Sequence, residues 1–205
     1  MPILSWPTGL RNPNSVSLAL VANTQSGGRS PFDGTEQTLE LPGSRWSAEI
    51  RWQNLPETQW RIMQAFIASL GGRAGRFTWG PNHMPRRGTR GGAAQVFGGG
   101  QTGRSLVTGF WSGSGLAFAV GDIVGWTDPV GREVFHMVTA DAPVDGSNAA
   151  TLQLAPPIRR SPTNGTALNL TNPRAVWRTT GDATALEYER GVFAAVQLSI
   201  EEAIF

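Results

Sequence analysis

Residues 38–79 read TLELPGSRWSAEIRWQNLPETQWRIMQAFIASLGGRAGRFTW and contain the two hydrophobic periodicities that decide the fold of this chain. From Thr38 to Trp52 apolar and polar side chains alternate, which is typical of half-buried β-strands. Pro42-Gly43-Ser44 interrupts the alternation and predicts a turn that joins two strands. A further strand is predicted from Arg76 to Trp79.

A single helix is predicted between these strands, from residue 56 to residue 70. Asn54 is expected to cap it, with Glu57 reaching back in a capping box. Gly71-Gly72 supplies the left-handed residues that end a helix. One apolar stripe recurs at helical spacing and consists of Trp60, Met63, Phe66, Ile67 and Leu70. Because no other segment has a helical period, we expect this helix to lie across the apolar face of a sheet.

The composition favours a mainly β chain. Twenty-six glycines and 14 prolines among 205 residues indicate short strands and many turns. The absence of cysteine excludes disulfides, thiolate chemistry and cysteine-based zinc sites. No apolar run approaches the roughly 20 residues that a membrane helix needs, so we expect a soluble chain that does not contact a membrane.

Charge is distributed unevenly along the chain. All 17 basic residues are arginine, and the formal charge is −1 over residues 1–57, +7 over 58–121 and −4 over 122–205. The middle block has no acidic residue. Its arginines are too widely spaced for a nucleic-acid patch and lack interleaved aromatic residues, so we expect them to match the acidic remainder or a neighbouring subunit.

The remaining pattern predicts two units. Residues 15–20 alternate as a strand, and Gln25–Pro31, rich in serine and glycine, are predicted to be a loop. Short strands at 116–126, 134–140 and 150–154, the last ending at Pro156-Pro157, suit a small β-barrel. Apolar and polar residues alternate again in the C-terminal segment, at 175–179, 185–189 and 192–200, with a turn predicted at Gly191. These predicted strands require partner strands in a sheet. We therefore expect residues 1–80 and 173–205 to form one unit, with residues 81–172 inserted as a removable barrel.

Catalytic, metal and cofactor chemistry find little support. His83 lies in a loop rich in proline and arginine, and His136 lies in an apolar strand, where a strand-face or core role is favoured over a catalytic one. Two pairs of close carboxylates, Glu187/Glu189 and Glu201/Glu202, are explained by exposed strand faces. Asp141 and the stretch Asp145–Asn148 could ligate calcium, but an Asx-type turn explains them better. We expect no enzyme activity, no cofactor and no metal.

Several short stretches of the sequence resemble, in the same order along the chain, the distal tail proteins of long-tailed (siphovirus-like) bacteriophages and related prophages. The resemblance runs from about Asn23 to Arg159, with a weaker match at Glu201-Glu202. These stretches are structural motifs rather than catalytic signatures. They are QTLELPGSRWSA (37–48), GRAGRF (72–77), QTG (101–103), GD (121–122), HMVTAD (136–141) and APPIR (155–159).

The resemblance implies a baseplate component with a tail-tube-like β-sandwich flanked by one helix and an outward-facing inserted barrel. It further implies a hexameric ring that joins the tail tube protein to the baseplate hub or tail fibre, with DNA only as cargo in the lumen. Such a protein is assembled in the bacterial cytoplasm and resides at the virion tail tip.

Two further hypotheses come from the residues. If identical copies pack head to tail, the basic surface at Arg73 and Arg76 could meet the acidic tail residues Glu201 and Glu202 of the next copy, so these four are the interface candidates. The alternative function is a carbohydrate-binding barrel module that presents Trp111, Trp126 or Phe135 to sugars.

Overall fold

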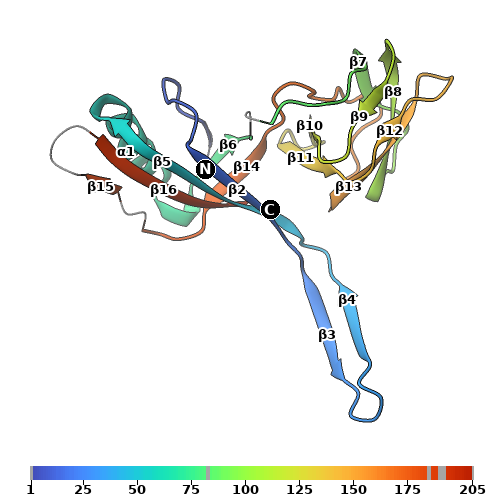
Figure 1. Cartoon of the computed structure of the whole chain (residues 1–205), viewed down its shortest axis with the longest axis horizontal. Coiled ribbons are helices and arrows are strands. Elements are labelled where there is room, and N and C mark those ends of the chain that lie inside the picture. The colour runs from blue at the N-terminus through green and yellow to red at the C-terminus, as the bar shows by residue number, and fades with distance from the viewer. Residues whose placement is uncertain (1, 82–83, 184–185, 189–192, 205) are drawn as a thin grey trace.

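The computed structural model describes residues 2–81, 84–183, 186–188 and 193–204. It consists of two lobes and a long arm that projects from their junction (Figure 1). The chain is mainly β with one helix, which confirms the fold class expected from composition and periodicity.

The first lobe contains a seven-stranded sheet in the order β1-β6-β14-β16-β5-β2, with β15 paired to β16. Its strands come from both ends of the chain: β1 (Ile3–Ser5), β2 (Ser15–Val21), β5 (Arg45–Pro56), β6 (Arg76–Trp79), β14 (Ala175–Thr179), β15 (Leu186–Tyr188) and β16 (Phe193–Glu202). The last strand pairs antiparallel with β5 and β14, so the C-terminal segment fills the middle of a sheet begun more than 140 residues earlier.

Helix α1 (Glu57–Leu70) covers one face of this sheet. The apolar stripe is confirmed: Met63, Phe66 and Leu70 are buried, and Trp60 and Ile67 pack against the same core. That core also contains Trp52, Phe77 and Trp177 from three strands. The helix therefore provides the layer opposite the sheet.

The two ends of α1 differ in how well the sequence predicted them. Gly71 has the expected left-handed conformation, with φ 61°. The capping box is wrong, because β5 continues through Asn54 to Pro56, which precedes the helix without a side-chain cap. Asn54 itself adopts φ 57° inside the strand. A short 3-10 turn, η1 (Gly72–Ala74), leads from the helix into β6.

The arm is a two-stranded ribbon of β3 (Thr24–Arg29) and β4 (Glu36–Glu40). The loop predicted at Gln25–Pro31 is wrong for most of its length. The break predicted at Pro42-Gly43-Ser44 does separate two strands, β4 and β5, but it is a bend and not a hairpin turn, because β4 pairs with β3 and β5 pairs with β2. The backbone N–H of Leu41 donates to Asn23 O at 2.7 Å, which joins the two chain segments between arm and sheet.

The second lobe is a five-stranded sheet in the order β10-β11-β13-β8-β7, curled around its own core, with a small β12-β9 ribbon. Its strands are β7 (Gly91–Val96), β8 (Gly103–Ser112), β9 (Leu116–Phe118), β10 (Ile123–Thr127), β11 (Glu133–Val138), β12 (Ala142–Pro143) and β13 (Ala150–Ile158). Residues 165–169 hydrogen-bond to both edge strands, since Leu168 N–H donates to Ala94 O and Asn169 N–H to Gly125 O. This segment closes the gap between β7 and β10.

Some predicted elements need correction or cannot be compared. β13 continues through Pro156 and Pro157 to Ile158, whereas the sequence predicted that it ends before them. The tail strand predicted at 185–189 is described only for Leu186–Tyr188, where β15 lies. The turn predicted at Gly191 and the loop position of His83 lie outside the described residues.

Candidate functional site

The two lobes share apolar packing at their junction. Phe135 of β11 is fully buried, and although its strand belongs to the second lobe, its ring joins the core of the first. Its ring centroid lies 5.7 Å from that of Trp46 on β5 and 5.9 Å from that of Trp177 on β14. Ile123 of β10 is also part of this core. The lobes are therefore joined by a continuous hydrophobic contact.

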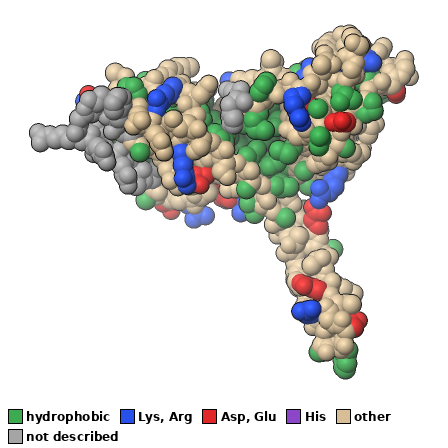
Figure 2. Space-filling view, in the orientation of Figure 1, with side chains coloured by type: hydrophobic (Ala, Val, Ile, Leu, Met, Phe, Trp, Pro, Cys, Tyr) green, Lys and Arg blue, Asp and Glu red, His purple; other side chains and the backbone are tan. Residues whose placement is uncertain are grey.

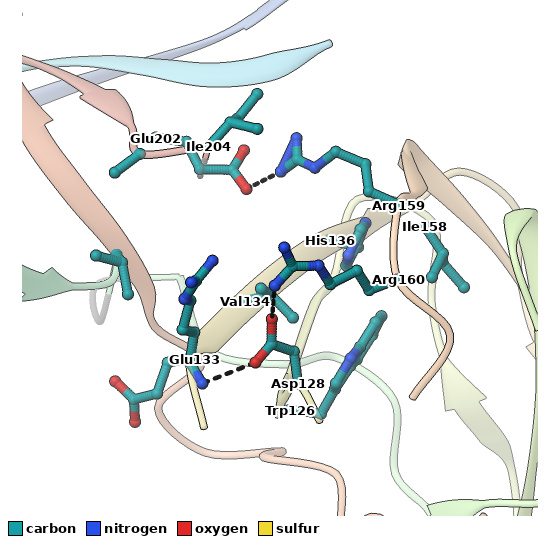
Figure 3. A pocket seen from close by; sticks show the side chains of 13 residues that line it. Trp126, Asp128, Glu133, Val134, His136, Ile158, Arg159, Arg160, Glu202 and Ile204 are labelled. Atoms are coloured by element: carbon teal, nitrogen blue, oxygen red, sulfur yellow. Dashed lines mark hydrogen bonds and ion pairs between the residues drawn. The ribbon is translucent and has the colours of Figure 1, made fainter. Parts of the chain in front are cut away.

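A buried ion pair joins the lobes beside this contact. Glu202, at the end of β16, pairs with Arg159, which follows β13 in the second lobe (Figure 3). The same carboxylate accepts the backbone N–H of Trp46 at 3.1 Å. Arg159 in turn donates to the carbonyl oxygen of Ser44 at 2.7 Å, at the base of the arm. One arginine thus contacts β16, the arm base and the second lobe.

Glu201 is engaged on the opposite face of the same strand. It accepts from Arg45 at 2.9 Å and pairs with Arg178 at 2.7 Å. Burial raises the pKa of Glu201, but the two guanidinium groups outweigh this and leave its pKa below the ordinary value. The expectation that Glu201 and Glu202 lie on exposed faces is wrong, since only 9% and 4% of each residue is accessible.

The basic interface candidates are placed differently. Arg73 lies exposed on η1, and its backbone N–H donates to Asp182 at 3.1 Å. The guanidinium of Arg76 turns inward and donates to the carbonyl oxygens of Arg73, Ala74 and Gly75 at 2.7–2.9 Å. Desolvation and the nearby Arg178 lower the pKa of Arg76. The structure therefore brings Arg76 close to Glu201 within one chain, and it leaves Arg73 at the surface.

Several arginines of residues 58–121, the block without acidic residues, also have partners within the chain. Arg87 Nε lies 3.6 Å from Asp122 Oδ1, and Arg104 Nη2 lies 2.6 Å from Glu40 Oε1 at the base of the arm. Arg86 donates to the carbonyl oxygens of Ala117 and Arg90. These contacts confirm that part of the block matches the acidic remainder.

A cavity of about 280 Å³ opens at the junction and is lined by Trp126, His136, Arg159, Arg160, Asp128 and Glu202 among others. Figure 3 shows that its charges face one another: Arg159 pairs with Glu202, and Arg160 lies 3.6 Å from Asp128. No serine, threonine or lysine is among the described residues that line it.

His136 is a core residue, as the sequence predicted. It is stacked on Trp126 with the ring centroids 4.6 Å apart, and its Nδ1 lies 2.8 Å from Pro156 O. The pKa of His136 is lowered to about 4, mainly by complete burial, with the Pro156 hydrogen bond opposing the shift and the nearby charge of Arg159 adding to it. His136 is consequently neutral in the folded protein near neutrality.

We expect this histidine to make the protein sensitive to acid. Between pH 6.5 and about 4 the unfolded chain binds a proton that the folded chain does not, so stability falls as the pH falls. The loss attributable to His136 amounts to at most about 3 kcal/mol. Urea unfolding across this range should show it for the parent, and His136→Phe should remove that part of the pH dependence. An unchanged pH dependence in the variant would contradict the assignment.

The acidic loop of the second lobe forms the predicted turn. Asp145 Oδ1 accepts the backbone N–H groups of Ser147 and Ala149 at 2.8 and 2.9 Å, which is an Asx-type turn. Asp141 instead accepts the backbone N–H of Val120. Across the described part of the chain, no group of three or more metal-ligating side chains gathers at one point.

The aromatic residues expected to meet sugars are not available to them. Trp111, Trp126 and Phe135 are 2%, 3% and 0% exposed, so none offers an open ring face. The exposed aromatic pair on this lobe is instead Phe97 and Phe110, whose centroids lie 6.4 Å apart. Neither residue was predicted as a binding residue.

The arm is the feature that the sequence reading missed. Every residue of β3 and β4 is exposed, and Figure 2 shows hydrophobic side chains at the far tip. Phe32 in the tip loop is 98% exposed and Leu39 of β4 is 61% exposed. The sequence signal that points to the arm is the turn-forming stretch Phe32-Asp33-Gly34-Thr35, which lies between β3 and β4 at the end of the ribbon.

No protein-family model and no curated protein matches the chain. In the part of the chain that the structure describes, no helix has the length and apolar character needed to cross a membrane.

Proposed function

We propose that this chain is a structural subunit of a phage tail tip, a distal tail protein whose copies form a ring between the tail tube and the baseplate hub or fibre. The arm is the observation that carries the proposal. An isolated two-stranded ribbon is at best marginally stable in water, and this one also exposes apolar side chains. Such an element gains its stability from a partner, which is typical of an assembly protein.

The contacts packed between the two lobes support the same function. A subunit that transmits a defined geometry between tube and hub needs its two parts held in a fixed relation. Here the Phe135 contact and the Arg159–Glu202 pair both cross between the lobes. The sequence resemblance supplies the rest of the proposal: a hexamer, the tube and hub proteins as partners, a location at the virion tail tip after assembly in the bacterial cytoplasm, and DNA as passing cargo.

Contacts between the four charged candidates are no longer part of this proposal. Glu201 and Glu202 are already paired with arginines of their own chain, so a neighbour's Arg73 would have to displace those partners. The ring contact must therefore use other surfaces.

Shortening the arm tests the proposal. Replacing residues 25–39 by a short Gly-containing turn should leave the lobes folded, since described residues of the arm strands contribute nothing to either buried core. We expect sedimentation velocity to show loss of higher oligomers for the shortened chain, at concentrations where the intact chain assembles. Circular dichroism controls for folding. Equal assembly of a folded, shortened chain would contradict the role of the arm.

A further inference from the structure

A groove of about 570 Å³ lies at the base of the arm. Its walls are the bend from Glu40 to Ser44, the stretch from Pro157 to Arg159 at the end of β13, and Ile204. The two charged residues at its rim are already paired, Glu40 with Arg104 and Arg159 with Glu202. The unsatisfied surface of the groove is therefore apolar, and it comes from Leu41, the prolines and the two isoleucines.

The tip of the arm is built to hold one aromatic ring outward. Ser30 N–H donates to Thr35 O at 2.8 Å, and Gly34 N–H donates back to Ser30 O at 3.0 Å. Asp33 accepts the Thr35 N–H at 3.1 Å, and Arg29 donates to Gly34 O at 3.0 Å. These bonds close the loop around Phe32, whose side chain contacts almost nothing. Pre-organisation of this kind lowers the entropic cost of binding.

The tip cannot reach the groove of its own chain. From Thr24 at the base to Phe32 at the tip the ribbon extends for about eight residues, or ~26 Å at about 3.3 Å per residue. Figure 1 shows the ribbon running away from the lobes throughout that length. Contact between the Phe32 side chain and an arm-base groove therefore requires a second molecule.

We propose that Phe32 of one copy inserts into the arm-base groove of the next copy, which deepens the proposed ring function and rests on it. Tip and groove are different surfaces of one chain, so the contact is heterologous and propagates from copy to copy, closing where the rotation permits. A specific interface uses roughly 20–30 residues a side. The exposed arm from Thr24 to Glu40 supplies most of that number, with Phe32 as its aromatic anchor.

Disulfide trapping tests the contact directly, because the natural chain has no cysteine. Pro31→Cys, which leaves the Phe32 ring in place beside the new thiol, and Ile204→Cys are purified separately, mixed and oxidised. We expect a 31–204 cross-linked dimer in large excess over the product of Pro31→Cys mixed with Ile62→Cys. Ile62 is a matched control, since it is the same residue type with 37% exposure against 44% for Ile204, and it lies on α1 in the first lobe.

A second measurement does not depend on cross-linking. Phe32→Ala should raise the dissociation constant for assembly by roughly 30-fold, as expected for an aromatic anchor, whereas Phe97→Ala on the second lobe should change it little. Rings that form normally with Phe32→Ala, and no excess of the 31–204 product, would overturn this docking mode and leave the ring proposal standing. A natural chain that forms no rings, together with no excess of the 31–204 product, would contradict both. Cross-linking of Pro31→Cys to a tube or hub protein instead of a second copy would also overturn the docking mode.

Discussion

Phe135→Ala is expected to lower the free energy of unfolding by roughly 3–5 kcal/mol. The substitution removes a fully buried ring and leaves a cavity between the two lobes. The ring lies between Trp46 and Trp177 of the first lobe while its backbone belongs to the second. The loss should therefore affect both lobes. Chemical denaturation measures its size, and hydrogen exchange locates it.

Phe118→Ala is the matched control for this prediction. Phe118 is equally buried but belongs to the core of the second lobe alone. We expect Phe118→Ala to increase exchange only in the second lobe, and Phe135→Ala to increase it also in β5 and β14. If exchange in β5 and β14 does not respond to Phe135→Ala, the two lobes do not share a core.

The shared contact also bears on the removable barrel predicted from sequence. Excision of residues 81–172 would take away Ile123 and Phe135 and expose Trp46 and Trp177 to water. Independent folding of the remaining lobe stays a prediction, and the structure gives a reason to expect the excised form to be destabilised.

Glu202→Gln should cost about 3 kcal/mol, near the lower end of what breaking a buried ion pair costs. The substitution leaves Arg159 facing a neutral group in a site where the arginine side chain is 25% exposed and the glutamate side chain 5%. Partial exposure of the arginine reduces the cost. Urea unfolding at neutral pH measures the change.

A surface pair of the same sheet serves as the control. Arg51 and Glu49 lie 2.9 Å apart with side chains 52% and 33% exposed, so Glu49→Gln should cost less than about 1 kcal/mol. Combining Glu202→Gln with Arg159→Met should cost less than the sum of the two single changes, because each single change leaves the other partner unpaired. Simple additivity would show that the pair does not couple the lobes.

Sequence patterns predicted the local structure where one periodicity dominates. The helix with its stripe from Trp60 to Leu70, the strand from Arg76 to Trp79 and the Asx turn at Asp145 all follow from spacing and turn chemistry within a few residues. In each case local spacing or turn chemistry is enough to specify the element, although β6 pairs with β1 and β14, which lie far along the chain.

The sequence patterns failed where a partner lies far along the chain. Glu202 resembles an exposed residue at the end of an alternating strand, since the arginine that buries it is 43 residues away. Phe135 alternates as a barrel residue would, and nothing local indicates that its ring enters the other core. The arm has too few apolar residues for a period, because its ribbon covers no core of its own.

The most direct test of the ring is native mass spectrometry of the intact 21.9 kDa chain at rising protein concentration, with the arm-shortened chain measured alongside. The ring proposal predicts one dominant closed species at a fixed multiple of the subunit mass, which the resemblance makes a hexamer, and its absence for the shortened chain. A monomer under all conditions, with and without tube or hub proteins, or a ladder of oligomers without a preferred size that is unaffected by loss of the arm, would contradict it.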